Sequence, residues 1–380
     1  MDFEPSKEQK ELREAVVRFA RRELADDVAG RDARGEFSRI LWQRCASFGV
    51  QGFPIPEDYG GSGLDPLSLA IALEALGYAC ADNGLLFSLG AQMWSCQMPI
   101  LTFGREDQKR RFLPGLCDGS LIGVQAMTEP ASGSDAFGLT TRAERTTGGY
   151  VLNGTKTFIT NAPVADVFVV FARTGGEGFW GVSAFLVERN TPGLSVSREI
   201  HKMGLRTSPM GEVVCEDCEV PEDTLLGPLG GGLTVFNSSM EWERGYILAC
   251  AIGTMQRQLE RCIRYAKERR QFGQPIGKFQ AVSHRLVDMQ VRLETSRLLL
   301  YKLGWLRAAG QNTSAASATA KLHVSEAFLA SSLDAVQVHG GYGYTEEYEL
   351  ERDVRDAVGG RLYSGTSDIQ KNIIAGRLGL

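Results

Sequence analysis

Apolar residues recur at two different spacings along the chain. In about the first 120 residues, and again from about residue 231 to the end, they return at helical spacing, which is typical of amphipathic helices. In between, β-branched and aromatic residues form short runs separated by turn residues, which is typical of strands. The pattern predicts an α+β fold with an N-terminal helical domain over 1–120, a middle β domain over 121–230 and a C-terminal domain of the four-helix-bundle type over 231–380.

Local signals subdivide these regions. The first helical region is broken by the proline- and glycine-rich stretch 54–63 and again near Gly104. In the middle region, Asn153-Gly154 predicts a hairpin turn inside the strand-like run GYVLNGTKTFIT, because both residues accept positive φ. The long helical patterns of the last region cover about 233–268, 278–309 and 313–339.

Composition narrows the class of protein. The 380 residues are 43% hydrophobic and 23% charged, and the net charge of -5 argues against a nucleic-acid partner, which requires a concentrated basic surface. The N-terminal segment alternates charged and apolar residues as an amphipathic helix does, so it does not resemble a signal peptide. Because no apolar run is long enough to span a membrane, we expect a cytoplasmic protein without a membrane span.

The eight cysteines indicate buried free thiols in a reducing compartment, since they are scattered and several lie in apolar patterns. Only Cys215 and Cys218 form a C-x-x-C pair. No second pair and no nearby histidine accompany them, so we interpret them as alternating residues of the strand EVVCEDCEV and expect no metal site.

A polar loop of small residues is the strongest candidate for a ligand site. No G-x-G-x-x-G follows a strand, so the common dinucleotide fingerprint is missing. The loop Ala126 to Asp135, AMTEPASGSD, contains small residues that let backbone N–H groups approach a planar or anionic ligand; the alternative is an ordinary surface turn. By itself, the cluster Gly340 to Gly343 is typical of a helix C-cap followed by a turn.

Two separated motifs resemble those of the acyl-CoA dehydrogenase family. The loop from Thr128 to Asp135 matches the family's T-E-P-x-x-G-S-D signature. The second signature is matched by Gln337, Gly340, Gly341, Gly343, Tyr344, Glu347, Arg352 and Asp356. Further matching segments are 158–160, 268–273 with Gln280, and 364–370, so that the resemblance covers essentially the whole chain.

This resemblance implies a flavoprotein that binds FAD between the β domain and the C-terminal bundle. It also implies a homo-oligomer, usually a tetramer built from two dimers, in which a neighbouring subunit contacts the ADP half of FAD. The flavin would be lined by Gln125, Met127, Thr128, Gly133, Ser134, Phe158, Ile159 and Thr160, with Thr160 near N5. The remaining cofactor contacts would come from Arg269, Phe272, Gln280, Gln337, Gly340, Gly341, Thr366 and Asp368, with Arg269 reaching the pyrophosphate of the adjacent subunit.

The sequence departs from the common family pattern at the catalytic base. Most members carry a glutamate at the position of Ser364, and a serine hydroxyl is a far weaker base than a carboxylate. In some branches of the family the glutamate instead lies on the first long C-terminal helix, directly before an arginine, and Glu243-Arg244 matches that arrangement. Glu241 is the nearby alternative, but a helical residue two positions earlier points in a different direction. We therefore predict Glu243 as the base.

The resemblance also suggests substrate contacts. Ser134 and Arg244 would face the substrate, together with Ser364 and Gly365. The backbone N–H of residue 364 and the flavin ribityl chain would stabilise an enolate-like thioester oxygen, and this backbone donor survives the change to serine.

The sequence of the first C-terminal helix and the ending SGTSDIQ resembles the branch that acts on carrier-protein thioesters, including L-prolyl-carrier-protein dehydrogenases. We therefore expect α,β-dehydrogenation of an acyl or aminoacyl thioester held by a carrier protein, with a prolyl group as the leading candidate. The alternatives are a short or branched acyl-CoA dehydrogenase and a flavin-binding member without dehydrogenase activity. Electrons would pass to an electron-transferring flavoprotein or to oxygen.

Overall fold

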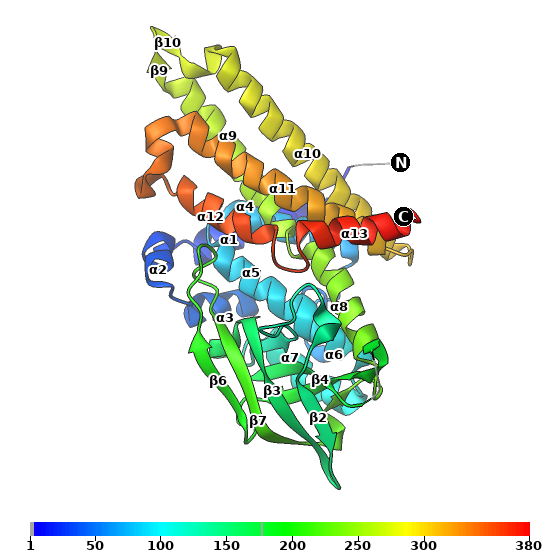
Figure 1. Ribbon diagram of the computed structural model, residues 1–380. Coiled ribbons are helices and arrows are strands. Elements are labelled where there is room, and N and C mark those ends of the chain that lie inside the picture. Colours follow the sequence, from blue (N-terminus) through cyan, green and yellow to red (C-terminus); the bar gives the residue numbers. More distant parts are fainter. Residues whose placement is uncertain (1–3, 176–177) are drawn as a thin grey trace.

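The computed structural model describes residues 4–175 and 178–380, and it is built from an N-terminal group of helices, a sheet and a C-terminal group of longer helices (Figure 1). The N-terminal helices are α1 (Lys7–Glu23), α2 (Val28–Arg34), α3 (Arg39–Phe48), α4 (Pro66–Ala79), α5 (Asn83–Gln92), α6 (Met98–Phe103) and α7 (Glu106–Cys117), with a π-helical turn at Met93–Gln97 between α5 and α6. Their ends follow from capping residues: Ser6 and Gln9 form a capping box at α1, and Asp65 caps α4 directly before Pro66.

The described residues of the middle region form a sheet of eight strands. The strands are β1 (Gly123–Ala126), β2 (Arg142–Arg145), β3 (Gly149–Thr160), β4 (Val167–Arg173), β5 (Val182–Glu188), β6 (Leu194–Glu199), β7 (Met210–Pro221) and β8 (Leu225–Leu226). The order across the sheet is β6-β7-β3-β2-β4-β5-β8, and β1 pairs with β4 in parallel. The strand-like runs GYVLNGTKTFIT and EVVCEDCEV are thus confirmed, as β3 and as part of β7.

The hairpin predicted at Asn153-Gly154 is wrong. Strand β3 continues through both residues, and the register against β7 shifts between Leu152 and Gly154, which marks a bulge. On the partner strand Asp217 has a φ of 46° and donates its N–H to the Asn153 side chain over 2.8 Å. Residues that accept positive φ are as suitable for a bulge as for a turn, and pairing with β7 decides between the two.

The bulge also changes the interpretation of the cysteine pair. In a regular strand Cys215 and Cys218 would point to opposite faces, because side chains alternate. The left-handed backbone of Asp217 interrupts the alternation, and both thiols are buried in the core of the sheet. The described residues contain no cluster of three or more potential metal ligands.

The C-terminal region consists of long helices and a small hairpin. It contains α8 (Gly232–Tyr246), α9 (Ala249–Glu268), β9 (Arg270–Gln271), β10 (Gln274–Pro275), α10 (Gln280–Ala308), α11 (Ser314–His339), α12 (Leu350–Gly360) and α13 (Ser367–Arg377). Figure 1 shows α9, α10 and α11 running together away from the sheet, with the hairpin at their far end. No helix in the described ranges has both the length and the apolar character needed to cross a membrane.

Two glycines bring α4 and α9 into close contact and join the first region to the last. A Cβ at Gly77 would lie 1.9 Å from the carbonyl oxygen of Cys250, and a Cβ at Gly253 would lie 2.0 Å from that of Glu74. Only glycine allows the two backbones to approach so closely. One large hydrophobic cluster includes side chains from the N-terminal helices, one face of the sheet and the C-terminal helices.

Candidate active site

A cavity of about 670 Å³ lies where the three regions meet. Its walls come from α5 and the π-helical turn, from β1 and the loop after it, from β3, from the β6–β7 connection, and from α8, α12 and the loop before α13. Of the site residues predicted from the sequence, those lining the cavity are Gln125, Met127, Thr128, Gly133, Ser134, Phe158, Ile159, Thr160, Glu243, Arg244, Ser364, Gly365 and Thr366. Segments up to about 240 residues apart in sequence therefore converge on one space, which is large enough for an organic cofactor and a small acyl group.

The loop after β1 is held from behind by a buried ion pair. The Glu129 carboxylate accepts hydrogen bonds from the backbone N–H groups and hydroxyls of Thr140 and Thr141, and Lys156 Nζ lies 2.8 Å from it. These partners and the lysine charge lower the pKa of Glu129 to about 2, although burial alone acts in the opposite direction. Because the carboxylate is fully satisfied inside the domain, the loop backbone in front of it is fixed.

A second bulge in β3 turns Phe158 into the cavity. The register against β7 shifts again between Lys156 and Ile159, and Phe158 has a φ of 57°. Its ring is 60% exposed and forms part of the cavity wall next to Thr160. An aromatic ring displayed by a bulge in this way is suited to packing against a planar ligand.

These features fit a flavin. The backbone N–H groups of Thr128 and Ser134 donate to none of the described residues, and a Cβ on Gly133 would meet nothing within 4 Å. The loop therefore presents free donors and open space to the polar edge of a ring system, while Phe158 provides an apolar surface.

Glu243 lies on the face of α8 that lines the cavity. Its carboxylate is buried, with the residue only 9% exposed, and accepts hydrogen bonds from the hydroxyls of Ser95 and Ser364. Desolvation raises the pKa of Glu243, while both hydroxyls and the charges of Arg244 and Lys321 oppose that increase. A carboxylate with a raised pKa beside a cavity is a candidate general base.

Glu241 lies elsewhere. It accepts a hydrogen bond from Thr313 and pairs with Arg307 at 3.5 Å, on the side of α8 that packs against the helical bundle. Of the two glutamates of α8, Glu243 alone contributes to the cavity wall.

The loop before α13 is held in a strained conformation. Ser364 has a φ of 57°, which L-residues adopt at a cost, and its carbonyl accepts a hydrogen bond from Gln370 Nε2 at 3.1 Å. The Gly365 carbonyl is bonded by the same amide and by Lys321 Nζ, at 2.8 and 2.7 Å. With both carbonyls fixed, the N–H of Ser364 donates to none of the described residues and remains available to an oxygen in the cavity.

Arg244 follows Glu243 on α8 and reaches the same cavity. Burial lowers the pKa of its guanidinium, and its Nε is buried without a hydrogen-bond partner among the described residues. A guanidinium in this state is a potential donor to a polar group of the substrate.

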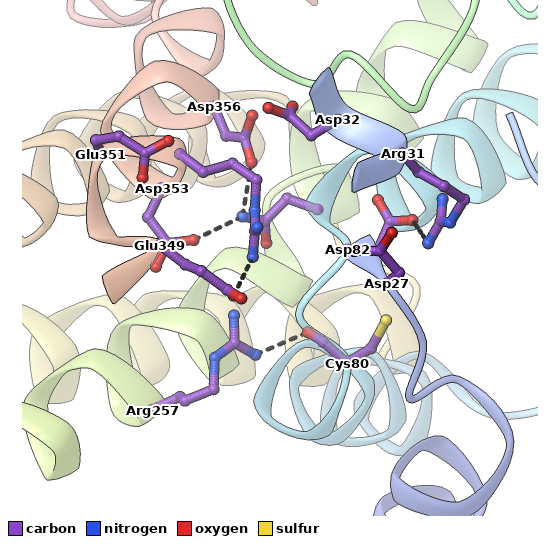
Figure 2. A network of polar contacts seen from close by, with 12 residues as sticks. Asp27, Arg31, Asp32, Cys80, Asp82, Arg257, Glu349, Glu351, Asp353 and Asp356 are labelled. Carbon is purple, nitrogen blue, oxygen red and sulfur yellow. Dashed lines mark hydrogen bonds and ion pairs between the residues drawn. The ribbon is translucent and has the colours of Figure 1, made fainter. Parts of the chain in front are cut away.

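A network of charged residues supports one wall of the cavity (Figure 2). On α12, Asp356 accepts hydrogen bonds from the Leu205 N–H and from the Asn83 side chain. Asn83 also donates to Asp353, and the neighbouring ion pair Arg31–Asp82 ties α2 to the start of α5. Burial raises the pKa of Asp356 to about 7. The network fixes the β6–β7 connection, whose residues 202–205 line the cavity.

The other predicted cofactor residues do not line this cavity. Arg269, Phe272, Gln280, Gln337, Gly340, Gly341 and Asp368 belong to the far ends of α9, α10 and α11, the β9–β10 hairpin and the start of α13. The Arg269 guanidinium lies 5.7 Å from the centroid of the Tyr342 ring, and Phe272 is 93% exposed at the hairpin tip. Their roles as cofactor contacts remain predictions.

Sequence reasoning missed one wall of the cavity. Phe87, Ala91 and Ser95 line it at four-residue steps along α5 and the π-helical turn, and the ring of Tyr363 lies 4.5 Å from that of Phe87. Lys321, which contacts the strained loop, was missed as well. The first three residues follow an ordinary helical pattern, and no local signal distinguishes them from core residues.

Comparison with known proteins identifies the family. Three family profiles match the chain in order: the acyl-CoA dehydrogenase N-terminal domain over 6–120, the middle domain over 124–218 and the C-terminal domain over 230–379. The chain is also 45% identical over 382 residues to an L-prolyl-[peptidyl-carrier protein] dehydrogenase from Pseudomonas fluorescens strain Pf-5, with 100% of both chains covered. The chain belongs to the acyl-CoA dehydrogenase family. The resemblance seen in the motifs and the predicted fold class are thereby confirmed.

Solved structures give the same result. The crystal structure of the prolyl acyl carrier protein oxidase AnaB matches with a TM-score of 0.98 at 47% identity, covering 99% of this chain and 100% of AnaB. The structure of PigA with FAD and proline matches with a TM-score of 0.98 at 43% identity, covering 100% of both chains. This acyl-CoA dehydrogenase family member is therefore similar over at least 99% of its length to a prolyl acyl carrier protein oxidase and to a protein solved with FAD and proline.

Proposed function

We propose that this protein is an FAD-dependent dehydrogenase that oxidises a prolyl group held as a thioester on a carrier protein. The observation that carries the proposal is the buried Glu243 carboxylate on the wall of the cavity, in a chain whose similar relatives and structures are named for prolyl-carrier substrates. Thr128, Ser134 and Phe158 would hold FAD, which would supply the acceptor of the hydride.

The side chains and backbone of this protein bind the thioester and remove its proton. The N–H of Ser364 donates to the thioester oxygen and stabilises the charge that develops there. Glu243 Oε removes the α-proton, and its raised pKa brings its basicity closer to that required near neutral pH. The walls formed by Phe87, Ala91 and Tyr363 exclude water from the acyl group.

Aromatic contacts at and behind the cavity wall support a short or cyclic acyl group. Phe87 and Tyr363 are in ring contact, and Trp94, which precedes Ser95 in the chain, is stacked against Trp242 with 6.1 Å between their centroids. These aromatic contacts leave little freedom for the wall to retract, so a long acyl chain would not fit.

We also propose that the protein acts in the cytoplasm as a homo-oligomer, with a tetramer as the expected form. Two exposed aromatic residues, Phe272 (93%) at the hairpin tip and Tyr344 (84%) after α11, support this proposal, because a neighbouring subunit would cover them. Arg269, Phe272 and Gln280 would then contact the cofactor of the adjacent subunit. All eight cysteines are free, as expected in a reducing compartment.

Anaerobic flavin bleaching tests the substrate. The purified holoenzyme is mixed with prolyl-, butyryl- and isovaleryl-loaded carrier proteins and with the matching CoA thioesters, and product masses are recorded. We expect the prolyl carrier protein to bleach the flavin fastest and to lose two or four hydrogens. Bleaching by acyl-CoAs alone would establish the acyl-CoA alternative, and protein that releases no FAD on denaturation would refute the proposal altogether.

The acceptor is tested with the same enzyme. Reduced holoenzyme is exposed either to oxygen or to an oxidised electron-transferring flavoprotein under anaerobic conditions, and the return of flavin absorbance is timed. The faster of the two reactions identifies the acceptor.

A further inference from the structure

Ser95 belongs to a helical turn that departs from α-geometry. Within Met93–Gln97 the chain forms a π-helical turn, in which the N–H of Met98 donates to the carbonyl of Met93, five residues earlier. Such turns are rare and concentrate at functional sites, because the wider turn redirects side chains. This turn packs against α8, where the Trp94 ring is stacked on Trp242. The irregular turn therefore lies directly beside the helix that carries Glu243.

The Ser95 hydroxyl contacts the base itself. Ser95 is 7% exposed, lines the cavity and donates to Glu243 Oε2, while the Ser364 hydroxyl donates to Oε1 at 2.5 Å. Each carboxylate oxygen thus has one hydroxyl partner. The two partners come from the N-terminal helices and from the C-terminal loop, so the carboxylate is held from both sides of the cavity.

Other charged and titratable groups near Glu243 act at longer range. Arg244 on α8 and Lys321 on α11 are the cations, and they lower the pKa of the carboxyl less than the two hydroxyls do. Tyr363 is a buried phenol with a raised pKa, and Asp356 also lines the cavity. Two uncharged hydroxyls are therefore the direct contacts of the carboxylate and the largest influences opposing its desolvation.

A hydroxyl can serve both protonation states of the base. It donates to the carboxylate before the reaction and, after rotation about its C–O bond, accepts from the carboxylic acid that forms. An arginine, a lysine or a backbone N–H can only donate and would favour the charged form alone. The serine keeps its own proton throughout, and the proton from the substrate remains on Glu243.

We propose that Ser95 is a positioning residue that holds the Glu243 carboxylate toward the substrate and stabilises its ionised form through the hydrogen bond to Oε2. The proposal rests on the proposed function, in which Glu243 removes the α-proton. Ser95 acts through Glu243 and itself takes neither the proton nor the hydride from the substrate.

The rate of anaerobic flavin bleaching by the substrate, measured against pH, tests the proposal. Loss of a hydrogen bond to a charged group destabilises the carboxylate, so Ser95→Ala should shift the acid limb of the profile to higher pH by about one unit. At pH values below the limb, bleaching should therefore be about tenfold slower than in the parent. FAD content should be unchanged. Ser95→Thr keeps the hydroxyl and should restore the position of the limb.

Ser88→Ala is the matched control. Ser88 lies seven residues earlier and donates to the Ser208 hydroxyl, so this variant removes a buried hydroxyl from the same helical segment without touching Glu243. Its acid limb should coincide with that of the parent. Ser95→Cys provides a second variant if Ser95→Ala loses its cofactor, because a thiol fills similar space but is a weak donor.

The outcomes separate this proposal from the assignment of the base. If Glu243→Gln bleaches at the parent rate, the proposed function has the wrong base. If Glu243→Gln is inactive but the acid limbs of both Ser95→Ala and Ser95→Cys coincide with that of the parent, Ser95 only fills space and the present proposal is wrong.

Discussion

Two buried carboxylates line the same cavity, and their partners differ in kind. Glu243 is bonded by two serine hydroxyls, each of which can rotate. Asp356 is bonded by the backbone N–H of Leu205 and by the side-chain amide of Asn83. Thr254 donates to the oxygen of that amide, which fixes its orientation. Desolvation raises the pKa of both carboxyls, so burial alone does not distinguish a base from a structural acid.

The hydrogen-bond partners of Glu243 and Asp356 differ in how they respond when the carboxylate is protonated. Rotating hydroxyls exchange donor and acceptor roles, so Glu243 can gain and lose a proton without leaving a polar group unsatisfied. Fixed donors cannot do so, and protonation of Asp356 would leave one of them facing a hydroxyl. We therefore interpret Asp356 as a support for the β6–β7 connection and Glu243 as the group that reacts.

Replacing Glu243 by Gln should have the largest effect. The amide keeps the shape of the side chain but cannot accept a proton, and general-base catalysis accounts for roughly 10²–10⁴ in rate. We expect a yellow protein with normal FAD content and a bleaching rate lower by that factor. Glu241→Gln is the matched control on the same helix, since Glu241 bonds Thr313 outside the cavity. Equal losses in both variants would contradict the separate roles of the two residues.

Moving the base should recover part of that loss. The hydroxyl of Ser364 lies 2.5 Å from Glu243 Oε1, so side chains from the two positions reach the same space. In Glu243→Gln/Ser364→Glu, the carboxylate at 364 should take up the α-proton and bleach the flavin at least about tenfold faster than Glu243→Gln alone. A double variant as slow as the single one would show that the direction of approach from α8 is essential.

The position of Glu243 on the cavity wall could be predicted from sequence, while its role as the base stays a prediction. The family signatures are contiguous, and the absence of glutamate at 364 together with Glu243-Arg244 points to a single alternative residue. The helical and strand-rich regions could also be predicted from sequence, because the spacing of apolar residues repeats over whole helices and strands. The hairpin prediction at Asn153-Gly154 failed because the conformational preference of these residues suits both a turn and a bulge. Only the pairing of β3 with β7 decides which of the two forms.

Ser95 could not be found in this way. It is one polar residue in an apolar helical run, and its partner is 148 residues away. Lys321, likewise, appears in sequence as one cation on a helix, whereas in the structure it donates to the Gly365 carbonyl. Contacts of this kind depend on how separate elements pack, and neither periodicity nor motif spacing contains that information.

Asp356→Asn should change how stability depends on pH. The folded pKa of about 7 lies above the ordinary value of 3.8, so the folded state retains a proton that the unfolded chain loses. The resulting stability is full below pH 3.8 and is lost as the pH rises through 7. The variant has no such loss of stability with pH. Its amide, however, faces the amide of Asn83 in place of a carboxyl group, so we expect the variant to be less stable than the parent at pH 5.

The stability difference should then shrink by about 1 kcal/mol or more between pH 5 and pH 8, because only the parent must bury a charge at the higher pH. Urea unfolding of the two holoproteins at both pH values measures the difference. A gap that is constant across this range would mean that Asp356 does not change its protonation between pH 5 and pH 8, and would contradict this prediction.

Lys321→Met should have the smallest effect and tests how far charge, as opposed to direct contact, controls the base. Burial lowers the pKa of Lys321 to about 8, so its positive charge is present near neutral pH, where it favours ionised Glu243. Removing that charge should raise the acid limb of the bleaching profile by roughly half a pH unit, less than the loss of the direct hydroxyl partner. Above pH 8 the two profiles should converge in shape, because the parent lysine has lost its charge there.

The variant also frees the Gly365 carbonyl, so a few-fold rise in KM should accompany the shift. Lys371→Met, which removes an exposed lysine paired with Asp368, is the control and should leave the acid limb of the parent unmoved. A shift in Lys321→Met as large as that in Ser95→Ala would show that the field of the nearby cations, and not the hydroxyl pair, sets the basicity of Glu243.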